Sequence, residues 1–217
     1  IRRPPRSTLF PSRRSSDLVT KYFTILFSAT AILSLAVMSY FAFWSDGKSC
    51  GTSVIAGGQG SIGGSFNLID HNGMNVSEKD IINGLTLIYF GYTYCPDICP
   101  LDTQRNLTTI DILDEQGINI KPVFITIDPE RDTVQALNDY VQASHERLIG
   151  LTGSIEQIQI ASRAYKTFFR KNGEGEDYLL DHSTFSYLMD ESGFLQFFRR
   201  DIEPEEVAKT ISCFANV

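Results

Sequence analysis

Cysteine and histidine are scarce in this chain, which has four of the first and three of the second among 217 residues. Four cysteines are too few for a protein held together by a framework of disulfides. A disordered chain is excluded as well, since 42% of the residues are hydrophobic and 12% are aromatic, enough to fill a core. The length suits one domain with an appendage.

Charge is absent from Tyr22 to Trp44, a run of 23 residues. A helix rising about 1.5 Å per residue would span about 34 Å here, and the hydrocarbon core of a bilayer is about 30 Å thick. Aromatic residues at both ends of the run suit the two membrane interfaces. We expect residues 22–44 to be an uncleaved transmembrane anchor. A cleaved signal peptide is the alternative, although its apolar region usually has about 7–15 residues.

The charge differs sharply on the two sides of this run. Residues 1–21 carry six basic side chains and one acidic side chain, whereas the chain from Ser45 onward has 13 basic and 25 acidic residues, a net charge of −12. Because an acidic body repels phosphates, we expect no nucleic-acid partner. The positive-inside rule keeps the basic flank in the cytoplasm, so we expect a single-pass protein of the bacterial inner membrane with its body in the periplasm.

Two features of the N-terminal part allow other interpretations. Residues 1–18 are rich in Arg and Ser. Instead of a simple basic flank, they can therefore be a mitochondrial presequence, or they can be partly non-native. In the mitochondrial case the body faces the intermembrane space from the inner membrane. Residues 45–64, rich in Gly and Ser, are expected to form a flexible tether, and residues 65–217 the folded domain.

The body alternates β-forming runs with segments that have helical periodicity and helix-capping residues. The pattern predicts a hairpin from residue 65 around a turn at 71–73, and strands at 85–90, 122–127, 148–151, 184–189 and 194–198. It predicts helices at 101–116, 132–145, 154–169 and 203–214. Strands separated by helices, followed by an antiparallel pair, indicate an α/β fold with a mixed sheet and helices on both of its faces.

Cys95 and Cys99 lie in a proline-flanked turn directly after the first buried strand, Gly91-Tyr-Thr-Tyr-Cys-Pro-Asp-Ile-Cys-Pro100. α/β proteins place their sites at the carboxyl ends of strands. Cysteines four residues apart at the start of a helix put their sulfurs on one face, and the helix N-terminus favours thiolates. Two thiolates select soft ions such as Cu(I) but need a third ligand. A structural disulfide or a pair of packed thiols is the alternative.

Each of the three histidines is a possible third ligand. His71 falls in the expected hairpin turn and His145 at the end of a polar helix, where we expect both to be solvated. His182 comes after an acidic loop and just before a strand, and either Asp181 or a backbone carbonyl can orient its ring. From the residues alone, His182 as a ligand stays an open hypothesis.

Three motifs together resemble the Sco/SenC family of copper chaperones. These are the cysteine turn, the segment Ile127-Asp-Pro-Glu-Arg-Asp-Thr133 and the segment Tyr178-Leu-Leu-Asp-His-Ser183, in the order and spacing of the family. The resemblance runs from about Gly63 to the C-terminus. It implies a thioredoxin-like domain tethered to the membrane, which binds copper as Cu(I), Cu(II) or both.

The resemblance also implies roles for individual residues. Cys95, Cys99 and His182 match the family's copper ligands, and the two cysteines match a pair that can form a redox-active disulfide. Asp128 and Asp132 fall in the family's DPxxD segment, where we expect turn and helix capping in place of ligation. Two other cysteines depart from the pattern. We expect Cys213 to be a packed thiol in the last helix and Cys50 an exposed thiol without a partner.

Two functions follow from the resemblance. The first is copper delivery, without catalysed turnover, to the binuclear centre of cytochrome c oxidase subunit II. The second is a thiol–disulfide oxidoreductase or redox sensor that acts on cysteines of a partner, including other copper or thiol-redox proteins of the same compartment. The spacing Cys-x-x-x-Cys differs from the Cys-x-x-Cys of the usual redox enzymes. His182 discriminates between the two, because copper needs it and a dithiol enzyme does not.

Overall fold

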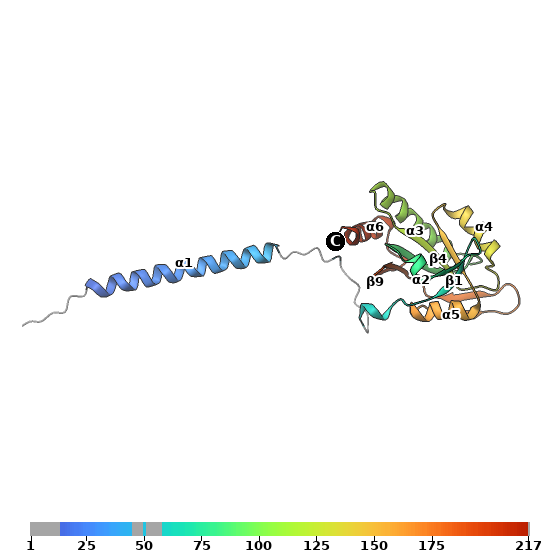
Figure 1. Ribbon diagram of the computed structural model, residues 1–217, viewed down its shortest axis with the longest axis horizontal. Helices are drawn as coiled ribbons and strands as arrows, with labels where there is room; N and C mark the ends of the chain where they lie inside the picture. The colour runs from blue at the N-terminus through green and yellow to red at the C-terminus, as the bar shows by residue number, and fades with distance from the viewer. Residues whose placement is uncertain (1–13, 45–49, 51–57, 217) are drawn as a thin grey trace, which may run out of the picture. The chain divides into compact units, whose positions relative to one another are not determined.

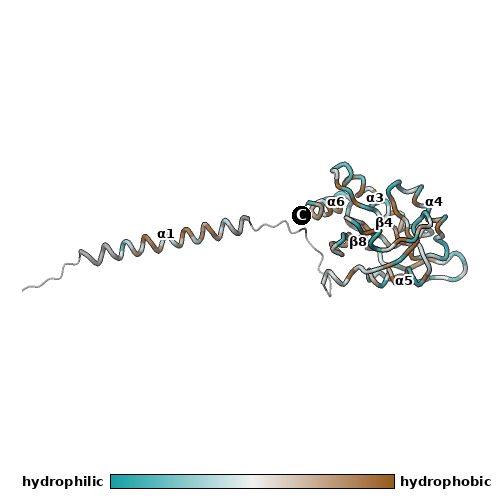
Figure 2. Tube along the Cα trace, viewed as in Figure 1, coloured by the Kyte–Doolittle hydropathy of each residue, from teal (hydrophilic) through white to brown (hydrophobic). Residues whose placement is uncertain are grey.

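The computed structural model describes residues 14–44, 50 and 58–216, and the chain divides into two compact units, residues 1–49 and 50–217. In the first unit, helix α1 (Arg14–Trp44) contains an apolar stretch, Thr20–Tyr40, long enough to cross a membrane. Figure 2 shows hydrophobic residues through the middle of this helix. The helix contains the whole of the predicted anchor. Most of the predicted tether lies outside the described residues.

The second unit is built on a seven-stranded sheet with strand order β2-β1-β5-β4-β3-β8-β9. The pairs β3–β4 and β4–β5 are parallel and the other pairs are antiparallel, which confirms the predicted mixed sheet. Its strands are β1 (Asn67–Asp70), β2 (Asn75–Ser77), β3 (Thr86–Gly91), β4 (Lys121–Thr126), β5 (Ile149–Thr152), β8 (Ser186–Asp190) and β9 (Gly193–Phe198).

Helices cover both faces of this sheet, as predicted, and Figure 1 shows α3, α4 and α6 on one side of the strands and α5 on the other. The hydroxyl of Tyr140 in α4 donates to Thr103 Oγ1 in α3 at 3.1 Å, which joins two helices of the first face. The helices of this unit are α2 (Glu78–Ile81), α3 (Ile98–Glu115), α4 (Val134–Ser144), α5 (Ile155–Ala164) and α6 (Pro204–Ala215), after a 3₁₀ turn η1 (Gln59–Ser61).

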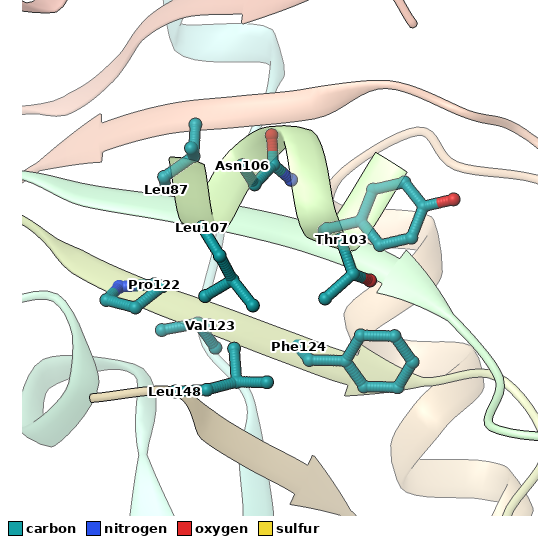
Figure 3. A pocket seen from close by; sticks show the side chains of 9 residues that line it. Leu87, Thr103, Asn106, Leu107, Pro122, Val123, Phe124 and Leu148 are labelled. Atoms are coloured by element: carbon teal, nitrogen blue, oxygen red, sulfur yellow. The ribbon is translucent and has the colours of Figure 1, made fainter. Parts of the chain in front are cut away.

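The core surrounds the interior strand β3, in which every residue is buried, as its apolar run predicts. Where α3 packs on β3 and β4, side chains leave a cavity of only about 10 Å³, the space of about one water molecule (Figure 3). Its lining includes Leu87, Leu107 and Phe124. This close packing fixes α3 against β3, and the cysteine turn joins these two elements.

The segment after α5 differs from the prediction. A helix was expected as far as residue 169, but α5 ends at Ala164 because Lys166 adopts a left-handed conformation with φ of 54°. The amide of Thr167 then donates to Ser162 O at 3.0 Å, closing the helix end as a Schellman motif does. The chain continues as strand β6 (Phe169–Asn172), which pairs with β7 (Leu179–His182) in a separate two-stranded sheet.

The expected states of Cys50 and Cys213 are wrong. The two residues form a disulfide with a Cα–Cα distance of 5.6 Å, and Cys50 is buried. The bond joins residues 163 positions apart, and no local pattern in the sequence links them. Cys50 begins the second compact unit, so this disulfide attaches the start of that unit to its last helix, α6.

Candidate metal centre

The cysteine turn begins where β3 ends at Gly91. A Cβ atom at this position would lie 2.8 Å from Tyr89 Cε1 and 3.0 Å from Phe124 Cε2, so any residue larger than glycine forces these rings to shift. Helix α3 begins at Ile98, which places Cys99 in its first turn and Cys95 just before the helix. Cys99 therefore lies in the first helical turn as predicted, whereas Cys95 precedes the helix.

The carboxylate of Asp132 stabilises the cysteine turn through hydrogen bonds. It accepts hydrogen bonds from Thr93 N at 3.0 Å, from Thr93 Oγ1 at 2.5 Å and from Thr126 Oγ1 at 2.6 Å. The residue is fully buried, and burial raises the pKa of its carboxyl despite these donors. The expected helix-capping role is therefore wrong for Asp132, because the side chain that caps α4 is that of Thr133. Asp132 connects β4 to the cysteine turn.

The two thiols are free and adjacent. The backbone N–H of Cys99 donates to Cys95 Sγ at 3.3 Å, and the exposed fractions of the two residues are 9% for Cys95 and 1% for Cys99. Cys95 lines a surface pocket of about 460 Å³, which also includes Ile98 and Leu180 in its wall. A partner that enters this pocket therefore meets the sulfur of Cys95 before that of Cys99.

His182 reaches the same point from the last residue of β7. Its Nε2 lies 3.2 Å from Cys99 Sγ, and its Nδ1 donates to the carbonyl of Ser183 at 2.8 Å. Because a carbonyl only accepts hydrogen bonds, Nδ1 carries the proton and the lone pair of Nε2 faces the sulfurs. The sulfurs of Cys95 and Cys99 and a ring nitrogen of His182 all lie within 4.8 Å of one another.

Of the two partners considered for the His182 ring, the backbone carbonyl makes the contact. Asp181 accepts hydrogen bonds from Arg170 Nη2 at 2.9 Å and Asn172 Nδ2 at 3.2 Å, both on the neighbouring strand β6. These bonds hold the pKa of the Asp181 carboxyl below its usual range. The charge of Asp181 favours a protonated His182 ring, but Nδ1 of the ring makes its hydrogen bond to the carbonyl of Ser183.

The other two histidines have different partners. Gly150 N donates to His71 Nδ1 at 3.2 Å, and His145 Nε2 lies 3.1 Å from Asp111 Oδ1. Both histidines are half-buried, whereas the sequence predicts solvated rings. Within the described ranges, Cys95, Cys99 and His182 form the one group of three or more His, Cys, Asp or Glu side chains placed to hold a metal ion.

The surroundings give the three side chains different acidities. Burial opposes the thiolate of Cys95, but the backbone N–H groups of Asp97, Ile98 and Cys99 outweigh it and lower the pKa of Cys95. Burial raises the pKa of Cys99, and Cys95 adds to this effect. Burial also lowers the pKa of His182, so its ring is neutral at pH 7 and Nε2 is available as a ligand.

A buried carboxylate below the centre was not found from the sequence. Asp102 is 2% exposed and accepts a hydrogen bond from Tyr89 Oη at 3.0 Å, and burial raises the pKa of its carboxyl. The Tyr89 ring packs edge-on against His182, with 6.3 Å between ring centroids. The signal in the sequence is spacing, because Asp102 follows Cys99 by three residues and so shares its face of α3.

Comparison with known proteins identifies relatives of this chain. A family model described as SCO1/SenC matches residues 56–216. The chain is 45% identical over 155 residues to the protein SenC of Rhodobacter capsulatus, which covers 70% of each protein. The chain belongs to the SCO1/SenC family. A mitochondrial SCO1 homolog of Arabidopsis thaliana is 45% identical over 147 residues, which cover 66% of this chain and 44% of that protein.

Solved structures of the SCO1/SenC family have the same fold. A crystal structure described as Arabidopsis thaliana ScoI with copper bound aligns with a TM-score of 0.69 and 41% identity over 72% of this chain and 99% of that one. A structure described as yeast Sco1 with copper bound aligns with a TM-score of 0.64 and 36% identity over 70% of this chain and 87% of that one. The predicted thioredoxin-like fold and family resemblance are confirmed.

Proposed function

We propose that this chain is a membrane-anchored copper metallochaperone, with copper as its cargo and Cys95, Cys99 and His182 as the ligands. The observation that carries the proposal is that these three donor groups lie within 4.8 Å of one another although they come from elements 83 residues apart. Two thiolates and a neutral imidazole suit Cu(I). The copper-bound relatives from Arabidopsis and yeast support the same choice of metal.

The pocket beside the site suits transfer by ligand exchange. Cys95 and His182 line the pocket, while Cys99 lies behind them at 1% exposure. An incoming thiolate or imidazole of a recipient can take the place of one of the two ligands that line the pocket while the others still hold the ion. The recipient that we propose is the binuclear copper centre of cytochrome c oxidase subunit II.

Thiol redox chemistry on the same pair is the second candidate function. The lowered pKa of Cys95 gives an attacking thiolate, and Cys99 lies next to it to complete a disulfide. In this function the substrate is a cysteine pair of a partner protein. His182 has no necessary part in it.

We further propose that α1 anchors the protein in the bacterial inner membrane with the second unit in the periplasm; the mitochondrial inner membrane, with the second unit in the intermembrane space, is the alternative. The apolar length of α1 and the basic residues at its N-terminal side support the orientation. The Cys50–Cys213 disulfide supports an oxidising compartment, since such bonds rarely persist in the cytosol. Membrane fractionation, with protease added from the outer side, tests this placement.

The test of function compares His182→Ala with the unchanged chain in two assays. For a copper chaperone, the substitution sharply reduces copper loading and delivery, while the rate of disulfide exchange between Cys95–Cys99 and a model dithiol stays the same. His145→Ala is the matched control, because His145 is also half-buried and hydrogen-bonded but contacts Asp111. Equal loss in both assays for His182→Ala, or unchanged copper loading, would contradict copper delivery.

A further inference from the structure

The strand that carries His182 lies outside the main sheet. β7 pairs with β6 alone, in a two-stranded sheet separate from the seven-stranded one. The hydrogen bonds of the seven-stranded sheet, which position β3 and the cysteine turn after it, therefore do not include the strand that carries His182. After His182 the chain enters β8 at Ser186, which pairs with Tyr89 of β3, and side-chain contacts between the β6–β7 hairpin and the rest of the domain add to this link.

Arg131, in the loop between β4 and α4, makes several of these contacts. Its guanidinium carbon lies 3.7 Å from the ring centroid of Tyr178, just before β7. The same atom lies 4.9 Å from the ring centroid of Tyr94 and 5.8 Å from that of Tyr92, both in the cysteine turn. One cation thus faces aromatic rings from both halves of the metal centre.

Hydrogen bonds fix the guanidinium in this place. Arg131 Nε donates to Asp128 Oδ2 at 2.6 Å, and its Nη1 donates to the carbonyl of Glu176 in the hairpin at 3.2 Å. Asp128 also accepts a hydrogen bond from the Tyr178 hydroxyl at 2.5 Å. The carboxylate is buried, with 3% of its side chain exposed, so its pairing with Arg131 is shielded from water.

Tyr92 carries the connection to the ligand. Its hydroxyl accepts a hydrogen bond from the backbone N–H of Leu180 at 3.2 Å, two residues before His182 in β7. Its ring packs edge-on against the imidazole of His182, with 5.9 Å between centroids and 82° between planes. Displacement of Tyr92 or of the hairpin therefore changes the distance between His182 and the two sulfurs.

We propose that Arg131 is a positioning residue that docks the His182 hairpin onto the cysteine turn and so keeps the imidazole in reach of the copper bound by the two thiolates. This inference rests on the proposed function. Lysine cannot replace Arg131, because an ammonium group lacks the planar fork that meets Asp128 and Glu176 while stacking on Tyr178. Substitutions in groups that orient metal ligands typically cost about 10–100-fold in metal affinity.

The test is a double-mutant cycle on the full chain in detergent, with Cu(I) affinity measured by competition with a chelator. Arg131→Gln is expected to weaken copper binding about 10–100-fold in the chain with His182, and to have no further effect in the His182→Ala background. Arg199→Gln, which removes an exposed ion pair with Asp201, is the control and leaves the affinity unchanged. Equal loss in both backgrounds, or no loss in either, would overturn the proposal.

A second measurement is independent of copper. Hydrogen exchange of the Leu180 amide reports whether the hairpin is docked, because this amide donates to Tyr92. Arg131→Gln and Arg131→Lys are expected to speed this exchange in the metal-free protein, and Tyr178→Phe, which removes the bond to Asp128, serves if either Arg131 variant does not fold. Unchanged Leu180 exchange in every folded variant contradicts the role of Arg131. Unchanged copper affinity in His182→Ala contradicts the copper site instead.

Discussion

Nε2 of His182 lies 3.2 Å from Sγ of Cys99, a contact between residues 83 positions apart. The carbonyl of Ser183 accepts a hydrogen bond from the protonated Nδ1, so the lone pair of Nε2 faces the sulfur. The centre therefore has its nitrogen ligand in the coordinating tautomer before a metal ion arrives. Because a sulfur that is still protonated must lose its proton to bind the ion, copper binding depends on pH.

The first prediction concerns the order in which the two thiols react. Backbone N–H groups lower the pKa of Cys95 while burial raises that of Cys99, so at neutral pH the thiolate is mainly on Cys95. We expect iodoacetamide to modify Cys95 first in the reduced, metal-free protein. The rate falls as the pH drops through the lowered pKa of Cys95, because the thiolate is then protonated. Peptide mapping by mass spectrometry identifies the modified residue, and faster modification of Cys99 would contradict this account.

The second prediction concerns Gly91, where the chain leaves β3. Gly91→Ala places a Cβ within 2.8 Å of the Tyr89 ring, and we expect a loss of about 1–3 kcal/mol in the free energy of unfolding from overpacking. Gly60→Ala is the matched control, since a Cβ there meets nothing within 4 Å. Denaturant unfolding measures both variants. Equal stability of Gly91→Ala and Gly60→Ala would contradict the predicted cost of overpacking at Gly91.

The third prediction concerns Asp132 and the support of the cysteine turn. Asp132→Ala leaves the buried hydroxyl of Thr126 and the amide of Thr93 without their acceptor, which we expect to cost about 1–3 kcal/mol in the free energy of unfolding. Asp139→Ala serves as the control, because Asp139 is exposed and bonded to Gln135 within the same helix. Thermal or denaturant unfolding gives the comparison. If Asp132→Ala loses no more free energy of unfolding than Asp139→Ala, Asp132 does not stabilise the cysteine turn.

The fourth prediction concerns the Cys50–Cys213 disulfide. Because it closes a loop across nearly the whole second unit, we expect Cys50→Ser/Cys213→Ser to lose about 2–5 kcal/mol in the free energy of unfolding under oxidising conditions. Under reducing conditions the unchanged chain and the double variant have the same stability. Cys95→Ser/Cys99→Ser, which keeps the bond, is the control. An equal stability of the double variant and the unchanged chain without reductant would contradict the assignment of the bond.

The part of the fold that could be predicted from the sequence is the part with strong local signals. The apolar runs that became β3 and β4 and the capping box at Ser154 that starts α5 are of this kind. The β6–β7 hairpin was not predicted, because its strands are short and mostly exposed, and contacts to the rest of the domain hold it in place. The left-handed residue that ends α5 is a lysine, a residue type that gives no stop signal.

The same division applies to the candidate site. The spacing of Cys95 and Cys99 and their place after a strand predict a thiolate pair from local sequence alone. His182 needed the family motif, because residues alone do not say which histidine approaches a cysteine pair across the fold. The contacts that Arg131 makes with the cysteine turn and with the β6–β7 hairpin, and the pairing of Cys50 with Cys213, depend entirely on tertiary structure.

The most direct test of the account is a Cu(I) titration of the reduced fragment 45–217, which contains the whole second compact unit, against a competing chelator. The fragment is measured beside Cys95→Ala, Cys99→Ala and His182→Ala, with His145→Ala as the control. The account predicts one tightly bound copper per chain in the fragment and in the control, and weakened binding in each of the other three variants. Retention of tight copper binding in His182→Ala, or no copper bound by the unchanged fragment, would contradict the Cys95–Cys99–His182 site.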